Sequence, residues 1–336
     1  MLKRYGLPVL KAQRVVNDIN TRFQEIYDHG ETAFRTPREM LEAVDLDGLV
    51  DQSGYDYFDA NNIGSRFVRE YVNGATRTFY GQDAAMNAVA CLTSLAGLGT
   101  VGSIYTPLAG LGTVGSIYTL EASNVELCQA LLSDAGAEVK TETPVQQIRT
   151  SRSGDPITVR TPEGRDSFDV VCLATPLPLA DISFEGADLT PTVRSHEFVE
   201  LSVVFVEGQP DPTYFGVDDP QSVPGLVVTE ATKETEFIHL LTREEAMAAD
   251  RSLYKLTSRG RISDSLLESM FECVEDVTEI TWKAFPRLEP TSTFSPFKFA
   301  PGLYYVNAME SIVSTMETEV IGSRNVANLI SADISE

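Results

Sequence analysis

Residues 169–176 read DVVCLATP and residues 303–311 read LYYVNAMES, and these two stretches decide how the fold is interpreted. The first predicts an apolar strand that ends in a turn of small residues, where a backbone can approach a nucleotide closely. The second predicts a strand, a turn and a helix, so that free N–H groups and the positive end of the helix dipole lie at the turn. Each stretch also has a plainer explanation, a buried core strand for the first and a capped helix for the second.

Outside these stretches, the apolar pattern changes from helical to strand-like after residue 135. Helical spacing predicts helices at residues 9–27, 37–44, 62–77, 83–95, 124–135 and 312–329. Alternating or continuous apolar runs predict strands at residues 138–141, 145–148, 157–160, 168–174, 199–207, 225–229, 236–241, 278–285 and 303–307. The order of these elements indicates an α+β fold with one embedded α/β element, in which the middle of the chain forms an antiparallel sheet.

The composition is that of a globular protein with an unusual charge balance. The 336 residues are enough for about two domains, and the 43% hydrophobic content excludes a disordered tail. The 49 acidic and 26 basic residues give a net charge of −23, which repels nucleic acids and anionic membrane surfaces. Seven lysines and nineteen arginines beside this acidic excess suit a halophilic archaeon, although an acidic mesophilic protein has the same signature.

Metal sites and membrane-spanning segments are not predicted. The four cysteines, at positions 91, 128, 172 and 273, form no C-x-x-C pair, and the three histidines are scattered singly. Residues 84–120 carry no charge, but their glycines and Pro107 interrupt any long apolar run. The start of the chain, MLKRYGLP, lacks the hydrophobic region of a signal peptide, so a cytoplasmic location is expected.

An identical repeat is the oddest feature of the sequence. LAGLGTVGSIYT occupies residues 95–106 and again residues 108–119, which indicates a recent or artificial insertion of thirteen residues. Each copy contains G-x-G-x-x-G, at residues 97–102 and 110–115. A dinucleotide-binding loop must follow a strand and open a helix, whereas here the preceding residues look helical and the following ones favour a strand. Neither copy is therefore predicted to bind a phosphate.

Residues 77–82, RTFYGQ, form a polar and aromatic junction between two predicted helices, which a glycine turn with a packed tyrosine also explains. Taken in order, this and the other motifs resemble the prenylcysteine oxidases, also called prenylcysteine lyases. The likeness rests on Tyr5-Gly6, Phe67-Val68-Arg69-Glu70, Tyr80-Gly81-Gln82, Asn87-Ala88, Asn124 with Leu127, and residues 169–177, 282–286 and 304–310. It covers residues 5–330 and is shared loosely with the flavin amine oxidases.

The resemblance implies an incomplete two-domain FAD-dependent oxidoreductase fold of the flavin amine oxidase type. It assigns residues 1–120 to a helical region on the substrate side, 121–182 and 300–336 to the FAD-binding domain, and 183–299 to an antiparallel-sheet substrate domain. The implied cofactor-binding residues are Val145, Ala174, Thr175, Pro176, Trp282, Phe285, Ala308, Met309 and Glu310, and the implied substrate-pocket residues are Tyr80, Gln82 and Asn87. It points to no catalytic base and no metal ligand.

The implied activity is FAD-dependent oxidation of the thioether of a farnesyl- or geranylgeranyl-cysteine. A hydride leaves the prenyl carbon attached to sulfur, water adds, and the products are cysteine, a prenyl aldehyde and, after reoxidation by dioxygen, hydrogen peroxide. Two alternatives stay open. One is another flavoenzyme of the amine oxidase type that acts on an isoprenoid or other apolar substrate, and the other is a non-catalytic remnant.

Two features depart from the family pattern. The family begins with a strand, a G-x-G-x-x-G turn and a helix that hold the FAD pyrophosphate, whereas this sequence opens at the helix that follows them. Residues 121–124 read EASN where the family has Glu-Gly-Gly-Asn. We therefore expect weak or absent FAD binding, in a truncated product or in one half of a split protein whose N-terminal FAD-binding half is separate. Eukaryotic members of the family are lysosomal.

Overall fold

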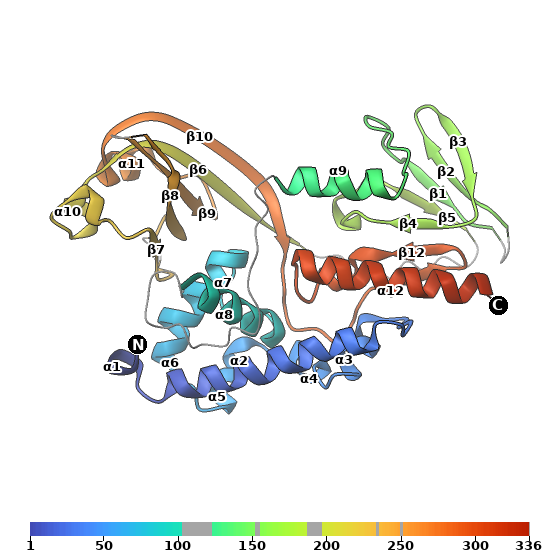
Figure 1. Ribbon diagram of the computed structural model, residues 1–336, viewed down its shortest axis with the longest axis horizontal. Helices are drawn as coiled ribbons and strands as arrows, with labels where there is room; N and C mark the ends of the chain where they lie inside the picture. Colours follow the sequence, from blue (N-terminus) through green and yellow to red (C-terminus); the bar gives the residue numbers. More distant parts are fainter. Residues whose placement is uncertain (103–122, 152–154, 187–196, 233–234, 249–250, 336) are drawn as a thin grey trace.

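The computed structural model describes residues 1–336 except 103–122, 152–154, 187–196, 233–234, 249–250 and 336 (Figure 1). The first third is helical, as expected. Its elements are α1 (Leu2–Tyr5), α2 (Pro8–Glu25), η1 (Ile26–His29), α3 (Pro37–Glu42), α4 (Asp47–Val50), α5 (Gly54–Ala60), α6 (Ser65–Phe67), the π-helical turn η2 (Val68–Val72), α7 (Asn73–Tyr80) and α8 (Ala88–Gly102).

Side-chain caps set where two of these helices begin. Thr36 accepts a hydrogen bond from the Glu39 N–H, so α3 begins with proline at its first position, as predicted. The helix predicted at residues 83–95 begins later, at Ala88, because the Asn87 Oδ1 accepts the Ala90 N–H and caps it. The glycine motif at residues 97–102 lies within α8, so it is not a loop between a strand and a helix. The second copy and most of the duplication lie outside the described residues.

The middle of the chain forms the antiparallel sheet that the sequence predicts. Its order is β10-β6-β9-β8-β7, and every pair in it is antiparallel. The strands are β6 (Phe198–Pro210), β7 (Leu226–Val228), β8 (His239–Ala248), β9 (Arg251–Ser258) and β10 (Phe271–Pro286). The short helices α10 (Pro212–Phe215), η4 (Pro220–Ser222) and α11 (Asp264–Met270) accompany it. The sheet arches over α7 and α8 (Figure 1).

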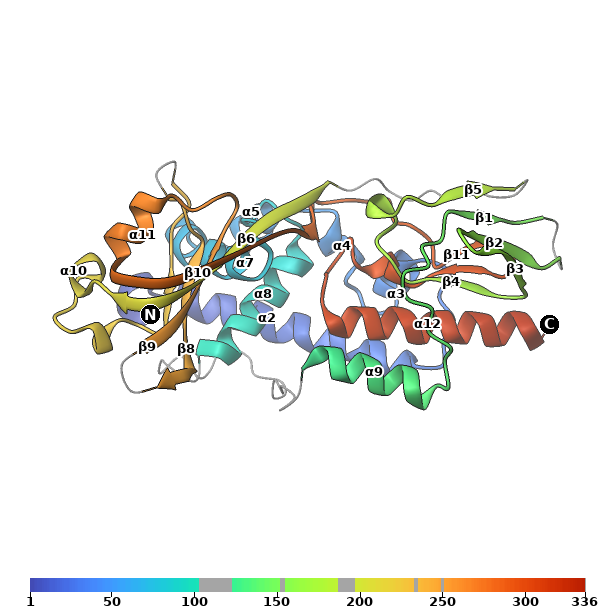
Figure 2. The ribbon, with the colours of Figure 1, turned by 90° about the horizontal axis from the view of Figure 1, so that it is seen from above.

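The rest of the chain forms two smaller sheets with two helices. The sheets have the orders β3-β2-β1-β5 and β11-β12-β4. The elements are α9 (Asn124–Asp134), β1 (Gln147–Arg149), β2 (Ile157–Thr161), β3 (Gly164–Phe168), β4 (Val171–Leu173), η3 (Leu177–Leu179), β5 (Ser183–Glu185), β11 (Lys298–Ala300), β12 (Leu303–Tyr305), η5 (Val306–Met309) and α12 (Met316–Ser335). Helix α9 lies beside α12 in both views (Figures 1 and 2).

Three sequence predictions in this part need correction. The strand predicted at 138–141 is wrong, because Gly136 (φ 62°) and Glu142 (φ 56°) both turn the backbone there and no ladder forms. The strand predicted at 168–174 is two elements, the end of β3 and then β4. The last helix begins at Met316 rather than at residue 312, since the Thr315 hydroxyl accepts the Thr318 N–H and caps it.

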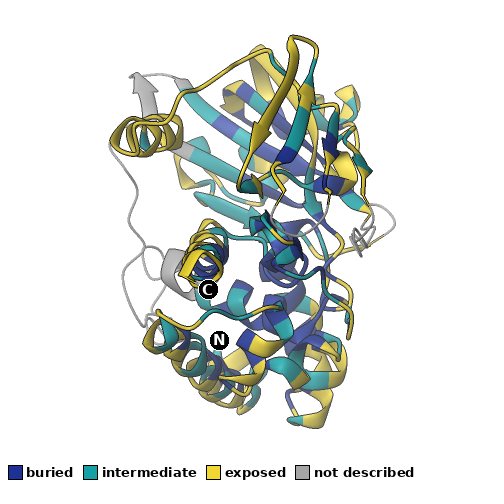
Figure 3. Ribbon diagram, turned by 90° about the vertical axis from the view of Figure 1, so that its right-hand side faces the viewer, coloured by how far each residue is buried: buried dark blue, intermediate teal, exposed yellow. Residues whose placement is uncertain are grey.

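The largest cluster of buried apolar residues crosses from the helical region to the sheet that contains β12. Phe58 and Leu92 from the helices belong to it together with Leu303 and Met309, all with 0% exposure. Figure 3 shows that buried residues concentrate where the helices and strands face one another. No helix in the described part of the chain is both long enough and apolar enough to cross a membrane. The division into domains at 120, 182 and 300 stays a prediction.

Candidate functional site

The two stretches that decide the fold meet at one edge of the sheet that contains β12. Strands β4 and β12 are parallel, with Val171 opposite Leu303 and Leu173 opposite Tyr305. Their carboxyl ends therefore lie side by side, so Ala174-Thr175-Pro176 and the η5 turn follow at the same edge. The crevice outside the carboxyl ends of parallel strands is where α/β sheets bind cofactors. We refer to residues 174–176 and 306–310 as the cofactor edge.

A polar atom without a partner lies at the cofactor edge. The Asn307 Oδ1 is buried and accepts no hydrogen bond from the described residues. Such an acceptor needs a donor, because a buried unsatisfied polar group costs about 1–3 kcal/mol. The pyrimidine part of a flavin carries one N–H between two carbonyls, so it supplies both a donor for Asn307 and acceptors for backbone N–H groups. This buried acceptor therefore fits the N–H group of a flavin.

Two carboxyl groups, Glu310 at the cofactor edge and Glu319 in α12, lie close to each other. Burial raises the pKa of Glu310, and burial together with the neighbouring Glu310 raises the pKa of Glu319 to about 7. A carboxyl group with such a pKa is half protonated near neutral pH and can then donate a hydrogen bond. Ala308 and Met309 are 1% and 0% exposed, so both residues are covered by the protein around them.

The other implied cofactor residues come from different elements. Val145 precedes β1 in a separate sheet, although it packs against the same hydrophobic core as Leu173. Trp282 and Phe285 lie near the end of β10. Phe285 packs edge-on against Tyr80, with ring centroids 5.1 Å apart, while Trp282 stays 43% exposed. The aromatic pair joins the long strand to helix α7.

The three implied substrate-pocket residues connect the helical region to the segment that follows β10. Tyr80 packs against Phe285 and is 3% exposed. The Gln82 side chain donates to the Pro286 carbonyl and accepts the Leu288 N–H, both at 3.0 Å. The Asn87 Nδ2 donates to the carbonyls of Leu288 and Ile312 at 3.2 and 3.0 Å. Gln82 and Asn87 therefore fasten the helical region to these segments by contacts within the protein, and their place in a substrate pocket stays a prediction.

An apolar surface lies next to these residues on the large sheet. Leu201 approaches helix α7 closely, since a Cβ built on Gly81 would lie 2.6 Å from its Cδ2. On the same face, Trp282 pairs with Leu201 and Ile280 pairs with Val203 across the two strands. Ile280 is 51% exposed. We call Leu201, Val203, Ile280 and Trp282 the inner face of the sheet, because it is the side that meets α7.

Two polar residues near this face were not singled out from the sequence as site residues. Arg77 is 8% exposed, and its guanidinium donates to the Thr229 carbonyl. His239 is 7% exposed, and burial together with the nearby Lys255 and Arg77 lowers its pKa to about 4, so it is neutral at pH 7. Arg77 belongs to the polar and aromatic junction at residues 77–82, but no role was assigned to it there. His239 did not stand out, because a lone histidine in a strand has no pattern. Within the described residues, no group of three or more His, Cys, Asp and Glu could hold a metal ion.

The helical layer, the large antiparallel sheet and the parallel strand pair together define a fold of the flavin amine oxidase type. The chain is similar to cyclohexylamine oxidase from Brevibacterium oxydans, with a TM-score of 0.53 and 13% identity over 95% of this chain and 75% of that one. It is also similar to the fatty acid isomerase that produces CLA in P. acnes, with a TM-score of 0.59 and 11% identity over 98% and 75% of the two chains. At these identities the likeness concerns the fold.

Within that class, the sequence identifies the family. The chain belongs to the prenylcysteine lyase family, whose model matches residues 1–336. It is 28% identical over 331 residues to farnesylcysteine lyase of Arabidopsis thaliana, which covers 97% of this chain and 62% of the relative. It is 27% identical over 348 residues to a prenylcysteine oxidase 1-like protein of Bos taurus, covering 97% and 68%. The chain thus spans about two thirds of the length of these relatives.

Proposed function

We propose that this protein binds FAD and oxidises the thioether of a prenylcysteine, releasing cysteine and a prenyl aldehyde, with hydrogen peroxide formed when dioxygen reoxidises the flavin. The observation that carries the proposal is the family match along the whole chain, together with the unpartnered Asn307 at the cofactor edge. FAD, when bound, supplies the acceptor for the hydride. The carbon next to sulfur loses that hydride, water adds to the same carbon, and the sulfur leaves as the thiol of cysteine.

The proposed cofactor contacts come from both halves of the cofactor edge and from β10. The backbone at Ala174, Thr175 and Pro176 and at Ala308 and Met309 would approach the flavin, while Glu310 and Asn307 would offer polar contacts. Trp282, Phe285 and Val145 would complete the lining. The support is the parallel pairing of β4 with β12, which brings the first two groups to one edge.

The inner face of the large sheet is the proposed binding surface for the prenyl chain. Ile280 and Trp282 are about half exposed there, and an isoprenoid that covers them removes apolar surface from water. Tyr80, Gln82 and Asn87 would hold the wall opposite, since their contacts fix helix α7 and the start of α8 against the segment after β10. In this proposal, residues 183–299 form the substrate domain and residues 1–120 its helical base.

A pyrophosphate-binding βαβ unit is the proposed source of the remaining FAD contacts. Strand β4 forms one edge of its sheet within the described residues, and a parallel strand can pair there. Helix α9 adds apolar residues for such a partner, because Val125, Leu131 and Leu132 are 63%, 61% and 43% exposed. The βαβ unit and the cofactor edge would then share one flavin site.

The test begins with an absorbance spectrum of the purified protein in high salt, before and after FAD is added and removed by gel filtration. A retained, structured flavin band supports the proposal, and S-farnesylcysteine should then yield cysteine and farnesal. Asn307→Leu should lower FAD retention about threefold to tenfold, the effect of one lost hydrogen bond, without loss of folding. Turnover of isoprenoid lipids but not of prenylcysteine would contradict the proposed substrate. Absence of flavin binding, even with the βαβ unit supplied separately, would contradict the proposed function.

A further inference from the structure

Helix α2 carries two apolar faces, and one of them lies outside the core. Val9, Ala12 and Val16 are at most 5% exposed and belong to the largest cluster of buried residues. Leu10 and Leu7, the residue that precedes the helix, lie on the opposite face, where they are 51% and 69% exposed. A single exposed leucine is ordinary, but a second apolar face on a helix whose first face is already buried needs its own explanation.

The exposed face combines leucines with cations. Four residues share this side of the helix through the spacing i, i+3, i+4 and i+7, namely Leu7, Leu10, Lys11 and Arg14. The preceding helix α1 adds Lys3 and Leu2, which is 57% exposed. Residues 1–17 contain four basic residues and no acidic one, in a chain whose net charge is −23. We call this set, Leu2, Lys3, Leu7, Leu10, Lys11 and Arg14, the basic leucine surface.

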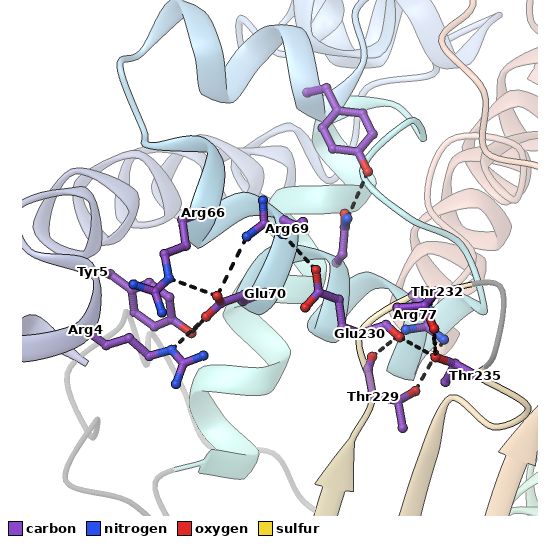
Figure 4. Close-up of polar contacts among 12 residues, drawn as sticks. Arg4, Tyr5, Arg66, Arg69, Glu70, Arg77, Thr229, Glu230, Thr232 and Thr235 are labelled. Atoms are coloured by element: carbon purple, nitrogen blue, oxygen red, sulfur yellow. Dashed lines mark hydrogen bonds and ion pairs between the residues drawn. The ribbon is translucent and has the colours of Figure 1, made fainter.

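The segment of α6 and the turn η2 extends the positive charge beside this surface. Gly64 lies against Pro8, since a Cβ built on Gly64 would be 3.3 Å from the Pro8 Cγ. Arg4 and Arg66 both bind the Glu70 carboxylate, at 2.7 and 2.9 Å (Figure 4). Two guanidinium groups thus accompany one carboxylate, so this neighbouring segment adds no negative charge that could neutralise the surface.

The cations of the basic leucine surface keep their charge available. Within the described residues, Lys3, Lys11 and Arg14 form no ion pair, and Lys11 donates to a neutral backbone carbonyl. The next carboxylate along α2, that of Asp18, is paired with Arg22 at 3.1 Å. Charges farther away than about 8 Å are largely screened at physiological salt. The distribution of charge therefore matters here more than its sum, and the net charge alone does not predict what this surface binds.

The chemistry of the basic leucine surface matches a lipid bilayer better than a second protein. A helix that presents leucine and basic residues together rests in the interface of an anionic bilayer, where leucine reaches the acyl chains and lysine or arginine reaches the phosphates. A stable interface with a second copy of the chain needs about 800 Å² on each partner, far more than three leucine side chains supply. Helices α1 and α2 lie on the side of the helical layer away from the large sheet (Figure 1), so a bilayer meets them first.

We propose that the basic leucine surface docks onto bilayers that contain anionic lipids. The leucines enter the boundary between head groups and acyl chains, and the basic residues bind the lipid phosphates. The inference goes beyond the proposed function and does not depend on it, because docking needs neither a flavin nor a substrate. It also revises the expectation from net charge that the protein avoids anionic membrane surfaces.

Flotation of the full chain with vesicles measures this docking. Vesicles of equal parts phosphatidylglycerol and phosphatidylcholine are compared with pure phosphatidylcholine vesicles, at the lowest KCl concentration at which circular dichroism shows the folded protein. Wild type should bind the anionic vesicles at least about tenfold more tightly than the neutral ones. Replacing two leucines together, Leu7→Gln with Leu10→Gln, should weaken this binding at least about tenfold. Replacing two lysines together, Lys3→Gln with Lys11→Gln, should weaken it about tenfold to thirtyfold.

Each double variant has a matched control on another surface. Leu131→Gln with Leu132→Gln changes two leucines of α9 that are 61% and 43% exposed. Lys140→Gln with Lys283→Gln removes two exposed positive charges, so it alters the net charge as much as the lysine variant does. Both controls should bind the anionic vesicles within about twofold of wild type.

Three results would overturn the inference. The first is a wild-type protein that does not float with anionic vesicles or floats equally with neutral ones. The second is a leucine variant that binds as tightly as wild type, since the leucines would then stay outside the bilayer. The third is a dimer in light scattering that becomes a monomer when Leu7 and Leu10 are replaced, without flotation of either protein, because a second copy would then cover the surface. None of these results bears on flavin retention, which tests the proposed function separately.

Discussion

Replacing Glu319 by glutamine should change how stability depends on pH. Burial and the neighbouring Glu310 raise the pKa of Glu319 from 4.5 to about 7, so the folded state holds this proton more tightly than the unfolded state. The stability that this proton gives is complete below about pH 4.5 and is lost as the pH rises to about 7. A glutamine side chain carries no charge at any pH, so the variant should lack this decline.

The magnitude follows from the size of the pKa change. A difference of about 2.5 in pKa corresponds to a ceiling of about 3.4 kcal/mol at 1.36 kcal/mol each. Glu319 is only partly buried, so water reduces this value. Because Glu319 lies in the first turn of α12, the helix dipole stabilises its ionised form by about 0.3–1 kcal/mol, which reduces the value further. We expect Glu319→Gln to be about 1–2 kcal/mol more stable than wild type at about pH 8, with little difference at about pH 5.

Denaturant unfolding at these two pH values and constant salt measures the effect. Glu268→Gln is the control, because Glu268 is an exposed residue of α11. Its stability should differ little from wild type at either pH. If Glu319→Gln and wild type change in parallel between the two pH values, Glu319 is already ionised in the folded protein at neutral pH. The reasoning from its burial would then be refuted.

Three further predictions concern other parts of the molecule. Hydrogen bonds from Arg4 and Arg66 lower the pKa of Glu70 to about 2 (Figure 4), so Glu70→Gln should lower the melting temperature at neutral pH. The difference between variant and wild type should vanish as the pH falls from about 4.5 to 2, where wild type loses this stability. Gly81→Ala should cost about 2–3 kcal/mol in denaturant unfolding, because φ is 65° and the Cβ would lie 2.6 Å from Leu201; Gly136→Ala, with φ 62° and open space, should cost only about 1 kcal/mol. The net charge of −23 predicts a melting temperature that rises between about 0.1 and 2 M KCl, and a flat or falling curve would contradict salt adaptation.

Sequence patterns predicted those parts of the fold whose signals are local. Helix α9 is one example, since Ser123 accepts the Glu126 N–H as its cap and Gly136 follows its end with φ 62°. Strands β4 and β12 are another, because each is a short apolar run before small residues. Strand β9 was missed because it mixes arginine, lysine, serine and apolar residues, and only its pairing with β6 and β8 makes it a strand.

The site was predicted less completely, since its contacts join residues that are distant in the sequence. A polar cavity that Arg77 and Arg259 line together is one case, because Arg259 comes from the end of β9 and nothing near either arginine indicates the other. Asn87 is another case, because the resemblance assigned it to a substrate pocket but gave no sign of its two hydrogen bonds. Its hydrogen bonds reach Leu288 and Ile312, 201 and 225 positions further along the chain, and they exist only in the folded state.

These contacts of Asn87 also hold the cofactor edge in a fixed position relative to the inner face of the sheet. Leu288 follows β10, the strand that carries Trp282, and Ile312 follows Glu310 in the segment between η5 and α12. One side-chain amide with 0% exposure therefore fixes the start of α8 against both segments. If either segment moved alone, its carbonyl would lose this buried donor, at a cost of about 1–3 kcal/mol. A substrate on the inner face and a flavin at the cofactor edge would thus meet in a geometry that is fixed before either binds.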